Sequence, residues 1–432
     1  MASTLTSTST SCPSDHLGWA SVPLDVLSVI LNKLSEYVDH VRVAGVCKGW
    51  RSIAKLYNNS TQRWHRVLPP MLLFPENSKG KSRNIHSRTK MRGVLYGVSE
   101  GKTYENIQLS LPSLISRTKT KRYFFGCGHG WLAQVEHRPQ CHVTLLNPFR
   151  KFESVSLPPL DIDAGSFAPQ KVKNIKVKNI KVILSAVPNL NRDNYVVVAF
   201  SMYGKNRIAF FEGGQKDWTY TFGPYRFIDA IFCKGDLYAV ECSGSTRRVS
   251  VFNVQSIFTK KAHSWQKPMA RLVIETPRFS RFGYLVESTL ENLFYIQKRW
   301  RPENGRIPRN DKRPPAKVMF RVYELAFSID GGQLMAEAVE VTSIGDEVLF
   351  VGDNKTSASV LASDFPGCQR NSIYDADAVL NFAAGPFRRY SVVPFDMGIF
   401  NLDEKETTLE YNYKKNRWKP YILRLTPPVE GL

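Results

Sequence analysis

Apolar residues near the amino end recur with the period of an amphipathic helix. The apolar stripe consists of Leu27, Ile30, Leu31 and Leu34. Their spacing of i, i+3, i+4 and i+7 puts the four side chains on one face of a helix of about three turns. Pro23 favours a helix start just before them, because its φ angle is fixed near the helical value and it lacks an N–H that a first turn leaves unsatisfied.

The pattern continues into two further short helices that end near Tyr57. Asp39 is a suitable N-cap for the second helix, and Gly49 is expected to separate it from the third. The apolar side chains of these two helices are Val41, Ala44, Val46, Trp50, Ile53 and Ala54. A module of about forty residues buries too little apolar surface to be stable alone. We therefore expect its apolar ridge to be covered, either by a partner subunit or by the rest of the chain.

From about Met91 onward the helical pattern disappears. Short runs rich in Val, Ile, Phe, Tyr and Thr are separated by Gly, Pro, Asn and Asp, as in NYVVVAFSM, AIFCKGDLYAVE and VMFRVYELA. Short strands divided by turn residues are typical of an all-β domain.

A degenerate repeat runs through this β region. The turn-and-strand unit GDLYAV at 235–240 recurs as ENLFYI at 291–296 and as DEVLFV at 346–351. Intervals of this size suit the four-stranded blade of a β-propeller, and the length of the region allows about six blades. The fold class predicted is thus mainly β with a small three-helix module, with a pair of packed β-sandwich domains as the alternative.

The sequence predicts four segments along the chain. Residues 1–15 form a Ser/Thr-rich disordered tail, 16–57 the helical module, 58–90 a linker and 91–432 the β domain. The linker is predicted from Pro69-Pro70 and the polar run NSKGKSRNIHSRTK, which are typical of loops.

Composition limits the compartment and the partners. The seven cysteines are scattered without repeated spacing, which indicates reduced thiols. The tail has no apolar segment typical of a secretory signal, and no apolar run approaches the ~20 residues of a membrane helix. We expect a soluble protein of the nucleus and/or cytoplasm. The net charge of +21 comes largely from clusters in 61–130 and 298–317, which are either solvated loops or sites for acidic partners.

Motifs of catalysis are weak, and we expect no enzyme activity, cofactor or metal. Gly97–Gly101 matches G-x-S-x-G, but the residues after Ser99 do not continue as a helix, as a nucleophile elbow requires. Cys127, His129, Cys141 and His142 offer four possible zinc ligands in no standard spacing. Arg122–Phe125 and Lys298–Arg301 interleave charge with aromatic rings that could stack bases. A basic nucleic-acid-associated or structural interaction protein is therefore the alternative function.

The helical module resembles an F-box, the domain that docks on the Skp-type adaptor of Skp-cullin-F-box ubiquitin ligases. The resemblance rests on Val22-Pro23, the apolar stripe and the run Val46–Arg51. The β domain resembles the propeller-like F-box-associated domain of plant proteins, through Leu146-Asn147-Pro148, Asn371–Tyr374 and Asp396–Leu402.

This double resemblance implies a substrate-receptor subunit of a plant ubiquitin ligase. The F-box would bind the adaptor, and through it the cullin, while the β domain would bind an unknown target protein. The predicted adaptor contacts are Pro23, Leu27, Ile30, Leu31, Leu34, Val46, Cys47 and Trp50.

Overall fold

The structure is a computed structural model of the 432-residue chain. It describes residues 19–34, 37–61, 70–76, 92–112, 122–137, 140–149, 153–161, 179–188, 194–202, 207–222, 226–243, 246–259, 282–302, 316–330, 333–352, 356–365, 367–378, 396–412 and 421–424. The chain divides into two compact units, one of residues 1–67 with 427–432 and one of residues 68–426. Each unit is considered by itself below.

The first unit is built from short helices. They are η1 (Trp19–Ser21), α1 (Leu24–Lys33), α2 (Tyr37–Val46) and α3 (Lys48–Thr61). α1 begins at Leu24, one residue after the predicted start at Pro23, and Pro23 is the N-cap residue, in extended backbone at φ −60° and ψ 152°. The carbonyl of Pro23 accepts the N–H of Leu27 at 3.1 Å. No helix in the described part of the chain is long and apolar enough to span a membrane.

Two predicted helix boundaries are wrong. Asp39 does not cap α2, because α2 begins at Tyr37. Its carboxylate lies in the first turn of the helix, where a negative charge interacts favourably with the helix dipole. It also forms an ion pair with Arg42 at 2.7 Å. Gly49 does not separate the helices either, since α3 already includes it. The break falls at Cys47, whose Sγ accepts the N–H of Trp50 at 3.4 Å, as an N-cap side chain would.

The second unit contains six β-sheets, which we number as blades in chain order. Blade 1 contains β24 (Tyr421–Arg424), β1 (Pro70–Glu76), β2 (Arg92–Gly97) and β3 (Lys102–Gln108). Blade 2 contains β4 (Arg122–Gly128), β5 (Trp131–His137), β6 (Cys141–Leu146) and β7 (Ser154–Ser156). Blade 3 contains β8 (Ile180–Leu184), β9 (Val196–Ser201), β10 (Arg207–Glu212) and β11 (Thr219–Phe222).

The remaining blades depart from four antiparallel strands in two places. Blade 4 contains β12 (Arg226–Cys233), β13 (Asp236–Ser243) and β14 (Thr246–Asn253), followed by helix α5 (Val254–Thr259). Blade 5 contains β15 (Phe282–Glu287), β16 (Leu293–Pro302), β17 (Ala316–Asp330) and β18 (Gln333–Val341). Blade 6 has the order β20 (Ala358–Leu361), β19 (Glu347–Val351), β21 (Ser372–Ala378), β22 (Asp396–Asn401) and β23 (Glu406–Asn412). The short helix η3 (Ala362–Asp364) follows β20 in the chain. Within blade 6, β19 and β21 run parallel.

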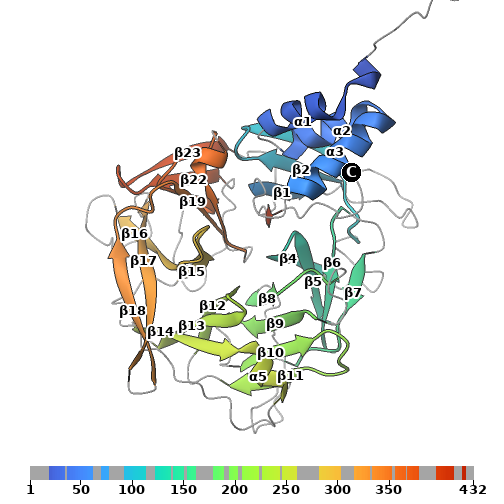
Figure 1. Cartoon of the computed structure of the whole chain (residues 1–432). Coiled ribbons are helices and arrows are strands. Elements are labelled where there is room, and N and C mark those ends of the chain that lie inside the picture. The colour runs from blue at the N-terminus through green and yellow to red at the C-terminus, as the bar shows by residue number, and fades with distance from the viewer. Residues whose placement is uncertain are drawn as a thin grey trace, which may run out of the picture. The chain divides into compact units, whose positions relative to one another are not determined.

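The six blades form a β-propeller, as predicted (Figure 1). Successive inner strands contact one another, from β24 to β4, β8, β12, β15 and β20. The repeated sequence unit corresponds to β13, β16 and β19, each of which pairs with the innermost strand of its blade. The repeat in the sequence therefore reflects one structural position in successive blades.

Blade 1 joins the two ends of the second unit, and part of the predicted linker belongs to it. Strand β1 lies inside the range 58–90, yet it pairs with β2 on one side and with β24 on the other. Pro70 is opposite Arg424 and Leu73 is opposite Tyr421. The run around Leu72 and Leu73 is buried, because it forms part of a sheet whose partner strand is about 350 residues away in the sequence, a distance over which local patterns carry no information.

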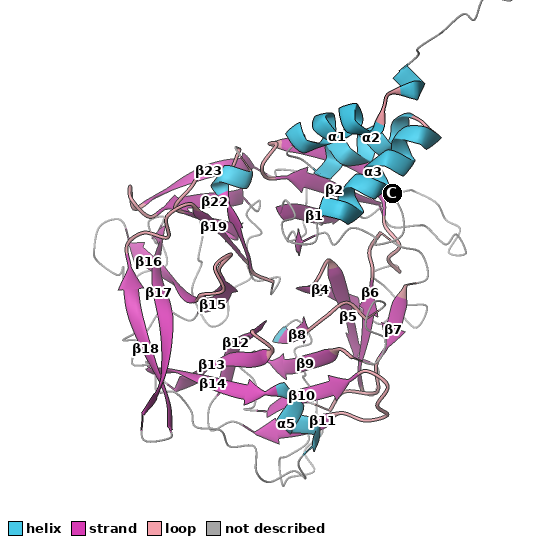
Figure 2. Ribbon diagram, in the orientation of Figure 1, coloured by secondary structure: helices cyan, strands magenta, loops and turns pink. Residues whose placement is uncertain are grey.

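The core of the propeller consists of layers between neighbouring blades. Apolar clusters lie between blades 2 and 3, 3 and 4, 4 and 5, and 5 and 6. Because both faces of a blade are covered, inner strands such as β8 and β9 are buried along almost their whole length and do not alternate between buried and exposed residues. Figure 2 shows most of the helical residues in the first unit, whereas the second has the short helix α5 and otherwise mainly strands.

Candidate functional site

The helical unit has a small core of its own. Leu27 and Leu31 of α1 are fully buried and pack with Ala44 of α2 and with Ala54 and Tyr57 of α3. Their predicted role is corrected accordingly: side chains with no exposed surface cannot contact a partner, so Leu27 and Leu31 stabilise the module itself. Ile30, Leu34 and Trp50 are half-buried against this core.

The surface of the module is rich in exposed apolar side chains. Pro23 is exposed and Cys47 is half-buried. Val46 is 59% exposed, and its contact role, like that of Pro23, Cys47, Ile30, Leu34 and Trp50, stays a prediction. The further exposed apolar side chains are Trp19, Leu24, Val26, Val29, Val41 and Leu56. A single exposed apolar residue is ordinary, but such a density on so small a unit is typical of a protein-binding surface.

Sequence reasoning missed Val26 and Val29, because the stripe was assigned to the surface. In an amphipathic helix the apolar stripe faces the core, and here it does. Val26 and Val29 are one turn apart on the opposite side of α1, and Val29 is 58% exposed. Apolar residues of α1 outside the stripe could have indicated an exposed apolar surface.

Polar contacts fix the three helices relative to one another. His40 of α2 is fully buried, with its ring nitrogens 3.2 Å from the Leu34 carbonyl and 3.1 Å from Asn58 Oδ1. The Tyr57 hydroxyl donates to Asn32 Oδ1 at 3.1 Å. Satisfied buried polar groups specify one arrangement of helices, which compensates for the small apolar core.

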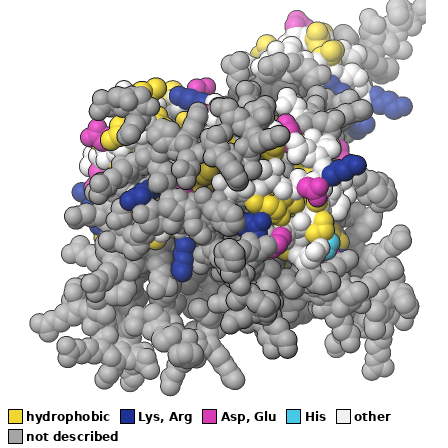
Figure 3. All heavy atoms as spheres, turned by 90° about the horizontal axis from the view of Figure 1, so that it is seen from below, with side chains coloured by type: hydrophobic (Ala, Val, Ile, Leu, Met, Phe, Trp, Pro, Cys, Tyr) yellow, Lys and Arg dark blue, Asp and Glu magenta, His cyan; other side chains and the backbone are white. Residues whose placement is uncertain are grey.

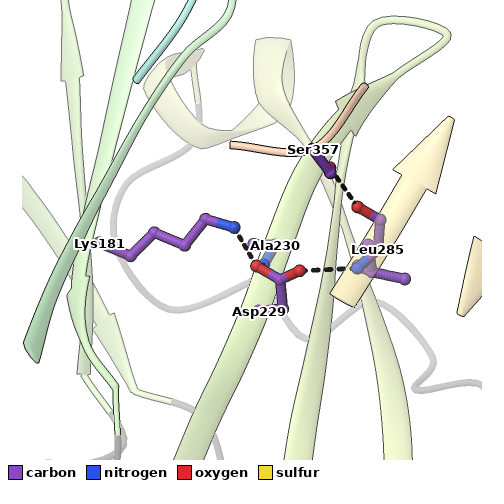
Figure 4. Close-up of polar contacts among 5 residues, drawn as sticks. All are labelled: Lys181, Asp229, Ala230, Leu285 and Ser357. Carbon is purple, nitrogen blue, oxygen red and sulfur yellow. Dashed lines mark hydrogen bonds and ion pairs between the residues drawn. The ribbon is translucent and has the colours of Figure 1, made fainter. Parts of the chain in front are cut away.

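The propeller has a chain of polar contacts across four inner segments (Figure 4). Lys181 of β8 forms a buried ion pair with Asp229 of β12. Asp229 Oδ2 accepts the backbone N–H of Leu285 in β15 at 2.6 Å. Ser357, just before β20, donates its hydroxyl to the Leu285 carbonyl at 2.5 Å. These contacts link blades 3, 4, 5 and 6 at their inner strands.

The charge of Asp229 depends on these neighbours. Burial raises the pKa of Asp229, while the Lys181 ammonium and the N–H groups of Leu285 and Ala230 oppose that rise. A second buried pair, Lys298 of β16 with Asp375 of β21 at 2.5 Å, joins blades 5 and 6. Nothing in the sequence pairs these residues, since each partner comes from a different blade.

The residues singled out for catalysis or metal binding are strand and turn residues. Ser99 is buried before β3, which is a strand, so the G-x-S-x-G match has no elbow geometry. Cys127 is buried among apolar side chains, and burial raises the pKa of its thiol. His129 contacts the Ser185 carbonyl at 3.1 Å. Among the described residues, no three His, Cys, Asp or Glu side chains are grouped as metal ligands would be.

Phe124, Phe125 and Lys298 of the interleaved basic and aromatic runs are internal, whereas the side chains of Trp300 and Arg301 lie outside the described residues. Phe124 and Phe125 are buried, and Arg122 pairs with Glu136 at 3.3 Å. Lys298 is buried with Asp375. In the view of Figure 3 the described Lys and Arg side chains lie in separate spots and form no continuous patch. These described aromatic rings are therefore covered by protein and not exposed for base stacking.

The fold and the module together define a six-bladed propeller protein with an N-terminal three-helix F-box-like unit. Residues 95–401 match the model of the KIB1-4 beta-propeller family, and the chain belongs to this family. It is 24% identical over 370 residues to At3g25750 of Arabidopsis thaliana, covering 82% of this chain and 86% of the relative. It is also 22% identical to the Arabidopsis F-box protein SKIP23, covering 93% of this chain and 94% of the relative. The F-box protein At2g26160 of the same plant is 22% identical, with 84% and 96% covered.

These findings confirm the predicted resemblance to plant F-box proteins with a propeller domain. Two asparagines of the motifs on which the resemblance rests stabilise turns through their side chains. Asn147 Oδ1 accepts the N–H of Phe149 at 3.0 Å. Asn371 has a left-handed φ of 52°, and its Oδ1 accepts the N–H of Ile344 at 2.9 Å. The motif thus reflects backbone geometry.

Proposed function

We propose that the protein is the substrate-receptor subunit of a Skp-cullin-F-box ubiquitin ligase. The helical unit would bind the Skp-type adaptor, and through it the cullin, and the propeller would bind a target protein. The proposal rests on one observation above all: the module buries its predicted stripe internally and exposes a second set of apolar side chains, including Val29 and Val46.

Burial of these side chains would provide the binding energy. A large apolar side chain transferred from water contributes about 1.5 to 3 kcal/mol, from which the costs of association are subtracted. A few such residues on a helix surface suit docking into the groove of a partner.

The subunit itself needs no catalytic group for this role. By holding a target on the propeller and the ligase on the F-box, it makes ubiquitin transfer effectively intramolecular. Effective concentrations of about millimolar are typical of such tethering. We propose accordingly that the chain is a receptor in the nucleus and/or cytoplasm and has no enzyme activity of its own.

Adaptor capture by surface variants tests the docking role. Val29→Asp and Val46→Asp, made separately in the full chain, are expected to reduce co-purification of the adaptor at least about tenfold, since each buries a charge at the interface. Because both side chains are exposed, the far-ultraviolet circular dichroism spectrum should not change.

The chain offers a matched control. Val339 of β18 is also exposed, at 49%, so Val339→Asp makes the same substitution on the propeller and should leave capture unchanged. Undiminished capture by both Val29→Asp and Val46→Asp would reject this surface as the docking site, and with it the receptor role proposed from it.

A further inference from the structure

Blade 5 presents a buried glutamine between two arginines. Side chains alternate along a strand, so Tyr295, Gln297 and Arg299 of β16 share one face. Arg321 of β17 is directly opposite Gln297 in the register. Tyr295 packs in the cluster between blades 4 and 5, which identifies this face as the one turned toward blade 4.

Gln297 indicates that a further polar group binds at this face. Its side chain is fully buried. Neither its Oε1 nor its Nε2 has a hydrogen-bond partner among the residues that the structure describes. An amide buried without partners is costly, and buried polar groups of folded proteins are nearly always hydrogen-bonded.

The two arginines make the surroundings positive. Arg321 Nη1 lies 3.2 Å from Glu340 Oε2, and both of these side chains are partly exposed. Burial lowers the pKa of Arg299, and the nearby charge of Arg321 lowers it further, against the weaker opposing effects of Tyr323 and Glu340. An added anion would reduce the repulsion between the two guanidinium groups.

Gly283 and Tyr295 lie next to Gln297 on this face of blade 5. Gly283 is opposite Gln297 on β15, and a Cβ at Gly283 would collide with the Tyr295 hydroxyl. The missing side chain thus lets that hydroxyl lie beside the strand position opposite Gln297. The guanidinium group of Arg247 in β14 is close enough to the Tyr295 hydroxyl to oppose the rise that burial causes in its pKa.

We propose that Gln297, Arg299 and Arg321 form a binding site for a protonated phosphoryl group. The guanidinium groups match phosphate oxygens in geometry and charge. Gln297 Nε2 would donate to a third oxygen, and Gln297 Oε1 would accept the phosphate O–H. An amide carbonyl needs such a donor, which the hydrogen phosphate ion has and the sulfate ion, similar in size and charge, does not.

The test is a titration of the full chain with sodium phosphate and sodium sulfate at constant ionic strength, by calorimetry and by thermal unfolding. Saturable binding of phosphate is expected, with sulfate at least about tenfold weaker for the missing hydrogen bond. Arg299→Gln and Arg321→Gln should each weaken phosphate binding at least about tenfold. Arg370→Gln, at an exposed arginine of blade 6, is the matched control and should bind as the native chain does.

Gln297→Leu separates a binding role from a structural one. The variant should lose the preference for phosphate over sulfate. Its melting temperature should be equal to or higher than that of the native chain, because the substitution removes a buried amide that has no partners. The proposal is overturned if the native chain shows no saturable binding, if phosphate and sulfate bind alike, or if Gln297→Leu keeps the preference. None of these results depends on adaptor docking.

The phosphoryl group could come from a free ion or from a side chain of a bound protein. Phosphoserine and a phosphoserine peptide, compared with inorganic phosphate at about pH 5.5, where most of the phosphate monoester keeps its O–H, distinguish these sources. Tighter binding of the peptide than of phosphate assigns the site to target recognition, whereas tighter binding of inorganic phosphate assigns it to a small-molecule ligand.

Discussion

The ammonium group of Lys298 on β16 lies 2.5 Å from the carboxylate of Asp375 on β21, and both side chains are almost completely buried. Residues from two blades thus neutralise each other inside the propeller. Removal of one partner leaves a buried charge without compensation, which is far more costly than the absence of both.

Lys298→Met should therefore destabilise the propeller by about 3–5 kcal/mol. The double variant Lys298→Met/Asp375→Leu should recover most of that loss, because apolar pairs of similar volume replace buried ion pairs at little cost. Urea unfolding followed by tryptophan fluorescence measures the stability of both variants.

Lys234→Met is the matched control, since Lys234 forms an exposed pair with Glu291 at 4.0 Å. This substitution should lower the stability by less than about 1 kcal/mol. A similar loss in the single and double variants would contradict the pairing.

The pair formed by Lys181 and Asp229 predicts a dependence on pH. Burial already raises the pKa of Asp229, and Lys181→Met removes the largest opposing effect, so that pKa should rise further. Above the raised pKa the variant must keep an unpaired buried carboxylate. As the pH falls through that pKa toward the unfolded value of about 3.9, the folded state takes up a proton first and the destabilisation shrinks.

Unfolding of native and Lys181→Met protein at several pH values between about 8 and about 5 measures this effect. The variant should be much less stable than the native chain at the alkaline end and approach it at the acid end. Lys181→Met/Asp229→Asn has no carboxyl group at this position, so its stability relative to Lys181→Met should also be greatest at the alkaline end and shrink toward the acid end. A difference between native and Lys181→Met that is constant with pH would refute the assignment.

Asn371 should tolerate few substitutions. It combines a φ of 52° with a side-chain hydrogen bond to the Ile344 N–H. Asn371→Ala loses the bond and strains the backbone, at a cost of about 1–3 kcal/mol. Asn371→Gly keeps only the backbone freedom, so its loss of stability should be smaller. Thermal unfolding of the two variants provides the comparison, and an equal loss in both would exclude backbone strain as a cause.

In the helical unit, core and surface variants should behave differently. Leu31→Ala removes a fully buried side chain and should cost about 2–5 kcal/mol. Val29→Ala removes an exposed one and should change stability by less than about 0.5 kcal/mol. Hydrogen exchange of the helical amides measures both in the full chain. Equal protection in the two variants would show that Leu31 does not stabilise the module.

The helical module illustrates what local sequence can predict. Its helix start after Pro23 and its stripe at Leu27 and Leu31 follow from spacing and backbone sterics, which act over a few residues. Two residues of that stripe, Leu27 and Leu31, were predicted to contact the adaptor but lie in the core of the module. The reason is that α1 contacts α3, and this contact depends on how α1, α2 and α3 pack together, which periodicity does not specify.

In the propeller, too, local patterns could be predicted from the sequence, whereas contacts between distant residues could not. The repeated strands and the six blades could be predicted from the chain alone, because every blade repeats the same short-range pattern of strand and turn. Only the tertiary structure decided that β1 pairs with β24, that Lys181 meets Asp229, and that Gln297 lies opposite Arg321. These pairs join strands whose positions depend on the register of neighbouring strands and on closure of the ring. A single sequence specifies such contacts only through the complete fold.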